Sequence, residues 1–203
     1  MQNESRHITH TMTSQAMRLH TVSSRNPAEF AVMGALDLQD SHGYRLVAFL
    51  QENLSGICWL GRSQIYALLS KLEHEGLTTH ERVEQSNLPS KKVFRLTEYG
   101  RNELRQWLAA PVSNLRDLRI EFLLKLFFAR LRSEDTEKVL LSEQLEVCKS
   151  RWSRLIEVRS GASNRIVQEA LEYRISMAQA ACVWLETLIK QTPNPSNKPV
   201  PTQ

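Results

Sequence analysis

The sequence has little proline and glycine and no long apolar run. It has 203 residues with 7 prolines and 7 glycines, and both fractions are below the average for proteins. Four of the prolines lie in the last eleven residues, and residues 112–192 contain one glycine, Gly161, and no proline. This stretch therefore predicts long helices with a single break. The longest apolar run, residues 122–129, is interrupted by Lys125 and is too short to span a membrane.

Cysteines are few and widely spaced. Cys58, Cys148 and Cys182 are odd in number and follow no disulfide framework, which is typical of a protein in a reducing compartment. The first 25 residues contain no apolar core of a signal peptide. We therefore expect a cytoplasmic protein.

Motifs of catalysis are missing. The sequence contains no GxSxG, P-loop, GxGxxG or HExxH pattern, and no cysteine and histidine have the spacing of metal ligands. We expect no catalytic residues, no metal and no cofactor, so an enzyme is the least favoured class of function.

The first half of the chain changes from a helical period to a strand period. Apolar spacing predicts three helices that begin near Asn26, Ser41 and Ser63. Residues 77–83 and 92–97 then predict a β-hairpin with a long polar loop. A fourth helix follows and should end at the next proline.

This order of elements is typical of a winged helix-turn-helix, here over residues 26–111. Residues 112–191 predict a helical, coiled-coil-like domain. The polar segments 1–25 and 192–203 predict a disordered arm and a disordered tail. The expected fold class is mainly α with a small β-hairpin.

The helical domain carries apolar stripes at coiled-coil spacing. One helix of this domain shows two stripes, which indicates two partners: the preceding helix and a second subunit. The alternative is a bundle within one chain that includes the winged domain. The candidate dimerisation residues are Leu141, Leu145, Cys148, Trp152, Ile166, Ala170, Tyr173, Met177, Trp184 and Leu188.

Polar and basic residues on the third helix and the hairpin predict contacts with double-stranded DNA. The net charge of +4 is by itself a weak indication. Glutamine can read adenine from the start of the helix, and wing lysines can bind phosphates, although a solvated surface is the simpler reading of both groups. The candidate DNA contacts are His42, Tyr44, Arg62, Ser63, Gln64, Tyr66, Lys71, Ser90, Lys91, Lys92 and Arg95.

Three segments resemble the PadR family of transcriptional regulators. Residues 42–50 (HGYRLVAFL) resemble its HGYEL helix, residues 63–77 its recognition helix, and residues 90–111 its wing and closing helix. Arg45 departs from the acidic residue of HGYEL, and Phe94 stands where tyrosine is common. The helical half is similar to the branch that includes virulence activators. The resemblance implies a homodimer, usually a repressor and sometimes an activator, and some relatives respond to phenolic acids or hydrophobic drugs.

The function expected from these patterns is a sequence-specific transcriptional regulator that binds a pseudo-palindromic operator as a homodimer. The alternative is a winged-helix module that binds another protein. A small aromatic or hydrophobic effector is a further candidate partner, and ordinary core packing is the competing role of the residues that could surround it. The candidate effector residues are Trp59, Trp107, Phe127, Phe128 and Trp152.

Overall fold

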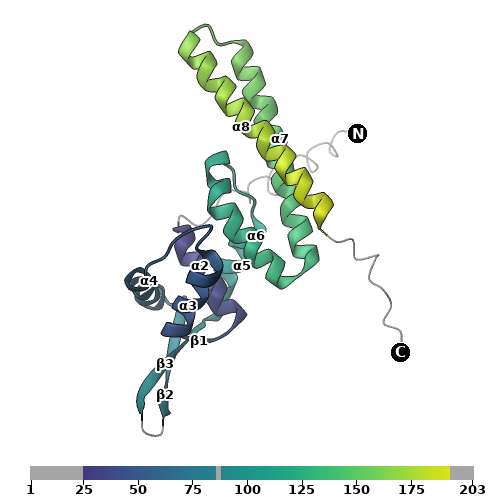
Figure 1. The fold of residues 1–203 in the computed structure, drawn as a ribbon. Helices are drawn as coiled ribbons and strands as arrows, with labels where there is room; N and C mark the ends of the chain where they lie inside the picture. The colour runs from purple at the N-terminus through teal and green to yellow at the C-terminus, as the bar shows by residue number, and fades with distance from the viewer. Residues whose placement is uncertain (1–24, 86–87, 193–203) are drawn as a thin grey trace, which may run out of the picture.

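Helices make up most of the computed structural model, which describes residues 25–85 and 88–192 (Figure 1). The side chains of residues 85 and 88–90 are outside this description. The predicted arm and tail lie outside it too, apart from Arg25 and Thr192. The elements in chain order are α2 (Pro27–Leu38), β1 (Ser41–His42), α3 (Gly43–Leu54), α4 (Arg62–His74), β2 (Thr78–Gln85), β3 (Leu88–Leu96), α5 (Glu98–Ala109), the 3-10 helix η1 (Leu115–Arg119), α6 (Glu121–Arg132), α7 (Glu134–Ser160) and α8 (Arg165–Gln191).

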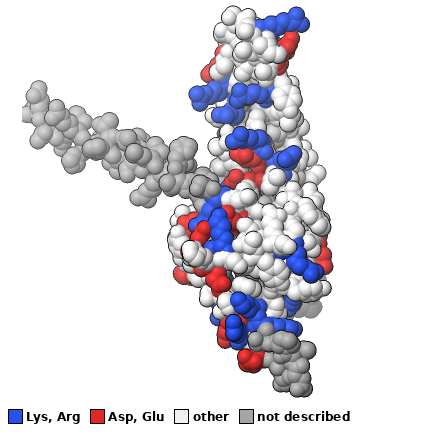
Figure 2. Space-filling model, turned by 90° about the vertical axis from the view of Figure 1, so that its left-hand side faces the viewer, with Lys and Arg blue, Asp and Glu red and all other residues white. Residues whose placement is uncertain are grey.

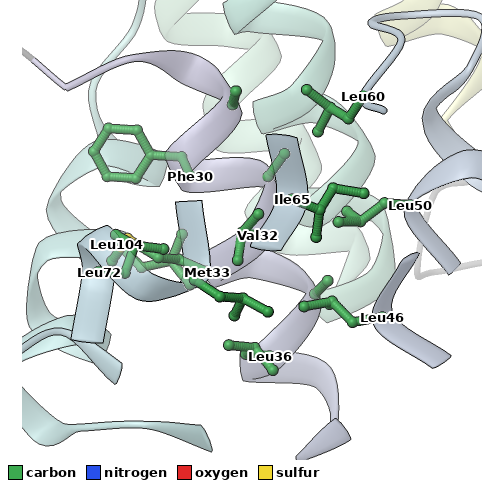
Figure 3. Packing of buried hydrophobic residues seen from close by; sticks show 14 of the residues in the cluster. Phe30, Val32, Met33, Leu36, Leu46, Leu50, Leu60, Ile65, Leu72 and Leu104 are labelled. Atoms are coloured by element: carbon green, nitrogen blue, oxygen red, sulfur yellow. The ribbon is translucent and has the colours of Figure 1, made fainter. Parts of the chain in front are cut away.

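Helix α2 lies at the centre of the winged unit. It begins as predicted, because the Asn26 side chain accepts a hydrogen bond from the Ala28 amide at 3.0 Å and Pro27 takes the first helical position. Every residue from Ala28 to Leu36 is buried. Figure 3 shows side chains of α3, α4 and α5 converging on Phe30, Val32 and Met33 of α2. Helix α6 adds Leu124 and Phe128 to the same core.

The sheet has the strand order β1–β3–β2 and is antiparallel throughout. The predicted hairpin is present, but its strands are longer than expected and reach Gln85 and Leu88, so most of the predicted polar loop is strand. Ser41 and His42 form a short strand that pairs with Phe94 and Val93 of β3. Helix α3 therefore begins at Gly43, two residues after Ser41. The spacing of apolar residues predicts local structure, so it could not predict this pairing between strands far apart in the sequence.

Two glycines allow the turn between α4 and β2 to dock against α5. Gly76 has a φ of +73°, the left-handed conformation that ends a helix. Gly100 lies so close to β2 that a Cβ atom there would be 2.1 Å from the Leu77 carbonyl oxygen. Thr97 caps α5 by accepting a hydrogen bond from the Gly100 amide at 3.0 Å. These contacts fix the base of the wing against α5.

The second half of the chain is a helical unit that extends away from the hairpin (Figure 1). Residues 115–132 form two elements, because the chain turns at Ile120 between η1 and α6. Helices α7 and α8 form a long antiparallel pair. Apolar side chains of α6, α7 and α8 form a second core, separate from that of the winged unit. None of the helices within residues 25–85 and 88–192 is long and apolar enough to cross a membrane.

The close approach at Gly100 predicts a large effect of a small substitution. Gly100→Ala places a methyl group against the Leu77 backbone, so we expect it to lower the free energy of unfolding by about 1–3 kcal/mol. Gly56→Ala is the matched control, since a Cβ there meets nothing within 4 Å. Urea denaturation of both variants checks this, and equal midpoints would contradict the proposed docking of the turn.

Candidate nucleic-acid interface

A cavity of about 520 Å³ lies between the start of α3, the middle of α4 and the wing strand β3. Five of the predicted DNA contacts line it: His42, Tyr44, Tyr66, Lys91 and Lys92. Residues more than 45 positions apart in the sequence thus share one surface. Figure 2 shows basic side chains gathered beside the hairpin tip at the lower end of the molecule.

The aromatic wall of this cavity depends on a glycine at the start of α3. A Cβ atom on Gly43 would be 2.7 Å from the Tyr66 ring, so only glycine lets that ring lie against α3. Tyr66 is still 42% exposed, and Tyr44 is 70% exposed. Both side chains are therefore partly open to a partner.

The cavity also gathers positive charge, including one residue that the sequence did not suggest. Arg45 lines it together with Lys91 and Lys92, and all three side chains are exposed. Within the part of the chain that the structure describes, none of the three forms an ion pair. The acidic lining residue, Glu73, bonds to the His80 ring. Arg45 stood out in the sequence only as a departure from a family pattern, although that departure adds a cation here.

Helix α4 presents three different faces. Ile65, Leu69 and Leu72 are buried in the core. Ser63, Ala67 and Ser70 lie on the opposite, exposed side, where small residues leave the helix backbone accessible. This outward face is the one that can enter a groove.

The remaining flank of α4 carries Gln64 and Lys71, which are two turns apart. The Lys71 ammonium donates a 2.8 Å hydrogen bond to Glu29, a carboxylate whose residue is only 2% exposed on α2, and this bond raises the pKa of Lys71. Lys71 therefore binds a buried carboxylate of the winged unit, and its contact with DNA stays a prediction. Gln64 shares this flank beside the start of α2, so its role as a base contact stays a prediction.

The predicted contacts on the hairpin also separate. Arg95 is half-buried and donates a 2.6 Å hydrogen bond to Glu81 across the sheet, so it is engaged within the sheet and not at the wing tip. The side chain of Ser90 lies outside the described residues. Arg62 is exposed at the first position of α4, where a phosphate can reach it. The wing contribution thus rests on Lys91 and Lys92.

The predicted dimerisation residues divide between the two long helices. Leu141, Leu145 and Cys148 are buried in the second core, so their stripe serves the same chain and not a second subunit. Trp152 and Leu188 are half-buried against that core. The remaining predicted residues, Ile166, Ala170, Tyr173, Met177 and Trp184, are all exposed on α8. Burial on the opposite side of α8, at Leu171, Ala178, Cys182 and Leu185, confirms that one stripe of α8 packs within the chain.

The structure does not bring the five predicted effector residues together. Trp107 stacks on Phe30 with ring centroids 4.4 Å apart, and Phe128 is buried in the same core. Phe127 packs against that core, whereas Trp152 belongs to the helical unit. Aromatic side chains thus fill cores here, which was the competing interpretation.

Trp59 lines a cavity, and its surface is 69% exposed. This second cavity, about 470 Å³, lies between the start of α2, the segment before α4 and η1. Arg116 and Arg119 also line it. Cys58 lines this cavity too. Burial raises the pKa of the Cys58 and Cys148 thiols, which makes them poor nucleophiles. No group of three or more histidine, cysteine or acidic side chains in the described ranges is arranged to hold a metal.

Comparisons with known proteins point to one family. The model of the transcriptional regulator PadR-like family matches residues 32–106. The negative transcriptional regulator PadR of Bacillus subtilis (strain 168) is 30% identical over 127 residues, which are 63% of this chain and 70% of that protein. A probable transcriptional regulator of Mycobacterium tuberculosis is 31% identical over 86 residues, covering 42% of this chain and 46% of that protein.

A solved structure is similar as well. The crystal structure of Bacillus subtilis PadR in complex with operator DNA is 25% identical and covers 83% of this chain and 100% of that chain, with a TM-score of 0.43. The family relationship follows from the sequence matches.

Proposed function

The chain belongs to the PadR-like family of transcriptional regulators, and we propose that it binds operator DNA as a homodimer and represses transcription. The observation that carries this proposal is the exposed outward face of α4 beside the basic cavity. Repression is inferred from the Bacillus subtilis relative, which is named a negative regulator. The protein then works in the cytoplasm, where its DNA lies.

In this proposal the outward face of α4 contacts bases, and the basic residues of the cavity contact phosphates. Ser63, Ala67 and Ser70 enter the major groove, where small side chains permit close contact of α4 with base edges. Arg45, Lys91 and Lys92 flank the groove and bind phosphates, which fixes the position of the helix without reading sequence. Tyr66 lies between the two groups and can hydrogen-bond to either.

The alternative is a winged-helix module that binds another protein. The cavity is exposed and basic, and it borders a helix face that has only small side chains. Such a surface favours binding of a polyanion over binding of an apolar protein surface. A gel shift on DNA from the upstream region of the protein's own gene separates the two functions, because a protein-binding module would leave that DNA unshifted.

The exposed stripe on α8 supports the homodimer. Ile166 and Tyr173 are each 67% exposed, and Met177 is 49% exposed. These residues follow the spacing of a coiled-coil seam along a helix whose other side is already packed on α7. A second copy of the chain covers such a stripe with the same residues, as in any two-fold interface.

Salt dependence tests the wing contacts. Replacing both Lys91 and Lys92 by alanine should weaken binding to operator and random DNA by similar factors. Each lost phosphate contact lowers the slope of log K against log salt by about 0.9, so four contacts in a dimer lower it by at most about 3.6. Fluorescence anisotropy at several salt concentrations measures this slope.

The matched control for that test replaces Lys149 and Lys190, which are exposed on α7 and α8 and far from α4 in sequence. This control has the same change in net charge and should keep the wild-type slope. An unchanged slope in the wing variant, or an equal drop in the control, would show that Lys91 and Lys92 are not phosphate contacts.

Sedimentation velocity tests the α8 interface. The wild type should sediment as a dimer at micromolar concentration, and Met177→Glu should sediment as a monomer because a carboxylate in the apolar seam loses its hydration. Val158→Glu on α7 is the control, since Val158 is 54% exposed but lies off the stripe. A monomeric wild type, or a dimeric Met177→Glu variant, is incompatible with this interface.

The second cavity is the place for an effector in this proposal. The exposed Trp59 can stack on an aromatic ring, while Arg116 and Arg119 can bind an acidic group. Substituted benzoates should therefore quench tryptophan emission and weaken operator binding, and Trp59→Leu should abolish both responses. If no aromatic acid alters either signal in the wild type, the cavity is not an effector site.

A further inference from the structure

The linker between the winged unit and the helical unit is held by two polar side chains. Residues 110–114 connect α5 to η1. The Lys125 ammonium of α6 donates a 2.6 Å hydrogen bond to the Ala110 carbonyl oxygen. The Gln144 side chain of α7 bonds to Val112 twice, accepting from its amide at 2.7 Å and donating to its carbonyl oxygen at 2.9 Å.

Both side chains are withdrawn from solvent, with exposures of 0% for Lys125 and 1% for Gln144. Burying an ammonium or an amide is costly unless its hydrogen bonds are made. Burial lowers the pKa of Lys125, while the Glu121 carboxylate at 3.1 Å partly offsets that effect. Their hydrogen bonds to the linker backbone explain why these polar groups occupy a core.

The same contacts reach the core of the winged unit. The Lys125 ammonium lies 4.9 Å from the centre of the Trp107 ring, and the Trp107 indole donates a 3.0 Å hydrogen bond to Glu121. Trp107 in turn stacks on Phe30 of α2. A continuous series of packed and hydrogen-bonded groups therefore runs from α2 to α6.

On the other side, Gln144 lies in the core of the helical unit. Its neighbours Leu141, Leu145 and Cys148 pack with Cys182 and Leu185 of α8. Helix α8 also carries the exposed stripe proposed as the dimer seam. The linker backbone is thus fastened to the helix pair that would hold the two subunits together.

We infer that Lys125 and Gln144 are positioning residues, which fix the angle between each winged unit and the dimer seam and so set the operator half-site spacing that the protein accepts. This inference rests on the proposed homodimer on paired half-sites. A stiff connection gives a high effective concentration of the second winged unit at one spacing only, whereas a loose connection spreads it over several spacings. Neither residue needs to contact DNA to have this effect.

The test uses full-length protein and DNA selected from a random pool by the wild type. Spacing preference is the ratio of Kd on duplexes with base pairs inserted between the half-sites to Kd on the selected spacing. Gln144→Leu and Lys125→Met should each reduce this ratio by about 5- to 150-fold, the range of ordinary coupling between sites. Affinity for a single half-site should stay at the wild-type value, which a general loss of folding would not allow.

Gln168→Leu is the matched control. Gln168 also donates a side-chain hydrogen bond to a backbone carbonyl, that of Ala162 at 2.6 Å, but at the opposite end of the α7–α8 pair. This variant should keep the wild-type spacing preference. Circular dichroism and sedimentation show whether each variant is folded and dimeric.

Several outcomes would overturn the inference. One is a folded, dimeric Gln144→Leu variant with the wild-type spacing preference, and another is a wild type that accepts all spacings equally. Should both substitutions prevent folding, hydrogen exchange in the wild type decides: the Val112 amide must be protected like the core helices, and rapid exchange contradicts a fastened linker. A wild type that binds only single half-sites instead refutes the proposed function.

Discussion

The burial of α2 is the constraint on which the rest of the structure depends. This helix is buried on every side from Ala28 to Leu36, so it is stable only when other elements cover it. Helices α3, α4 and α5, strand β3 and helix α6 all pack on it. Gly34 permits the last of these contacts, since a Cβ atom there would be 2.6 Å from the Phe128 ring. One buried helix thereby orients the recognition helix, the wing and the start of the helical unit together.

Burial of α2 also determines which charges remain free for a partner. Glu29 points its carboxylate to the edge of the core, where Lys71 and Arg25 bind it. The flank of α4 that faces α2 is therefore electrostatically satisfied, while its outward face has small uncharged residues. Arg45, Lys91 and Lys92, which form no ion pair within the described chain, border that face. The small residues of α4 allow the helix to enter a groove of DNA, and the neighbouring cations can bind the phosphates on either side.

Periodicity and turn residues were enough to predict the winged unit, the long C-terminal helices and the start of the first helix at Asn26. These features depend on local spacing. The contacts that the sequence did not predict join groups far apart in it: Lys71 with Glu29, Arg95 with Glu81, and the α7 stripe with α6 and α8. The hydrogen bonds of Gln144 to the linker were missed for the same reason, because the sequence around a glutamine does not indicate which distant residue it contacts.

Selection of DNA from a random pool by the full-length protein tests the central claim, paired half-site recognition by a homodimer, most directly. The account predicts enrichment of an inverted repeat whose half-sites lie about 10 base pairs apart, or a multiple of that distance. Selected sequences without an inverted repeat, or no enrichment over the starting pool, would contradict it.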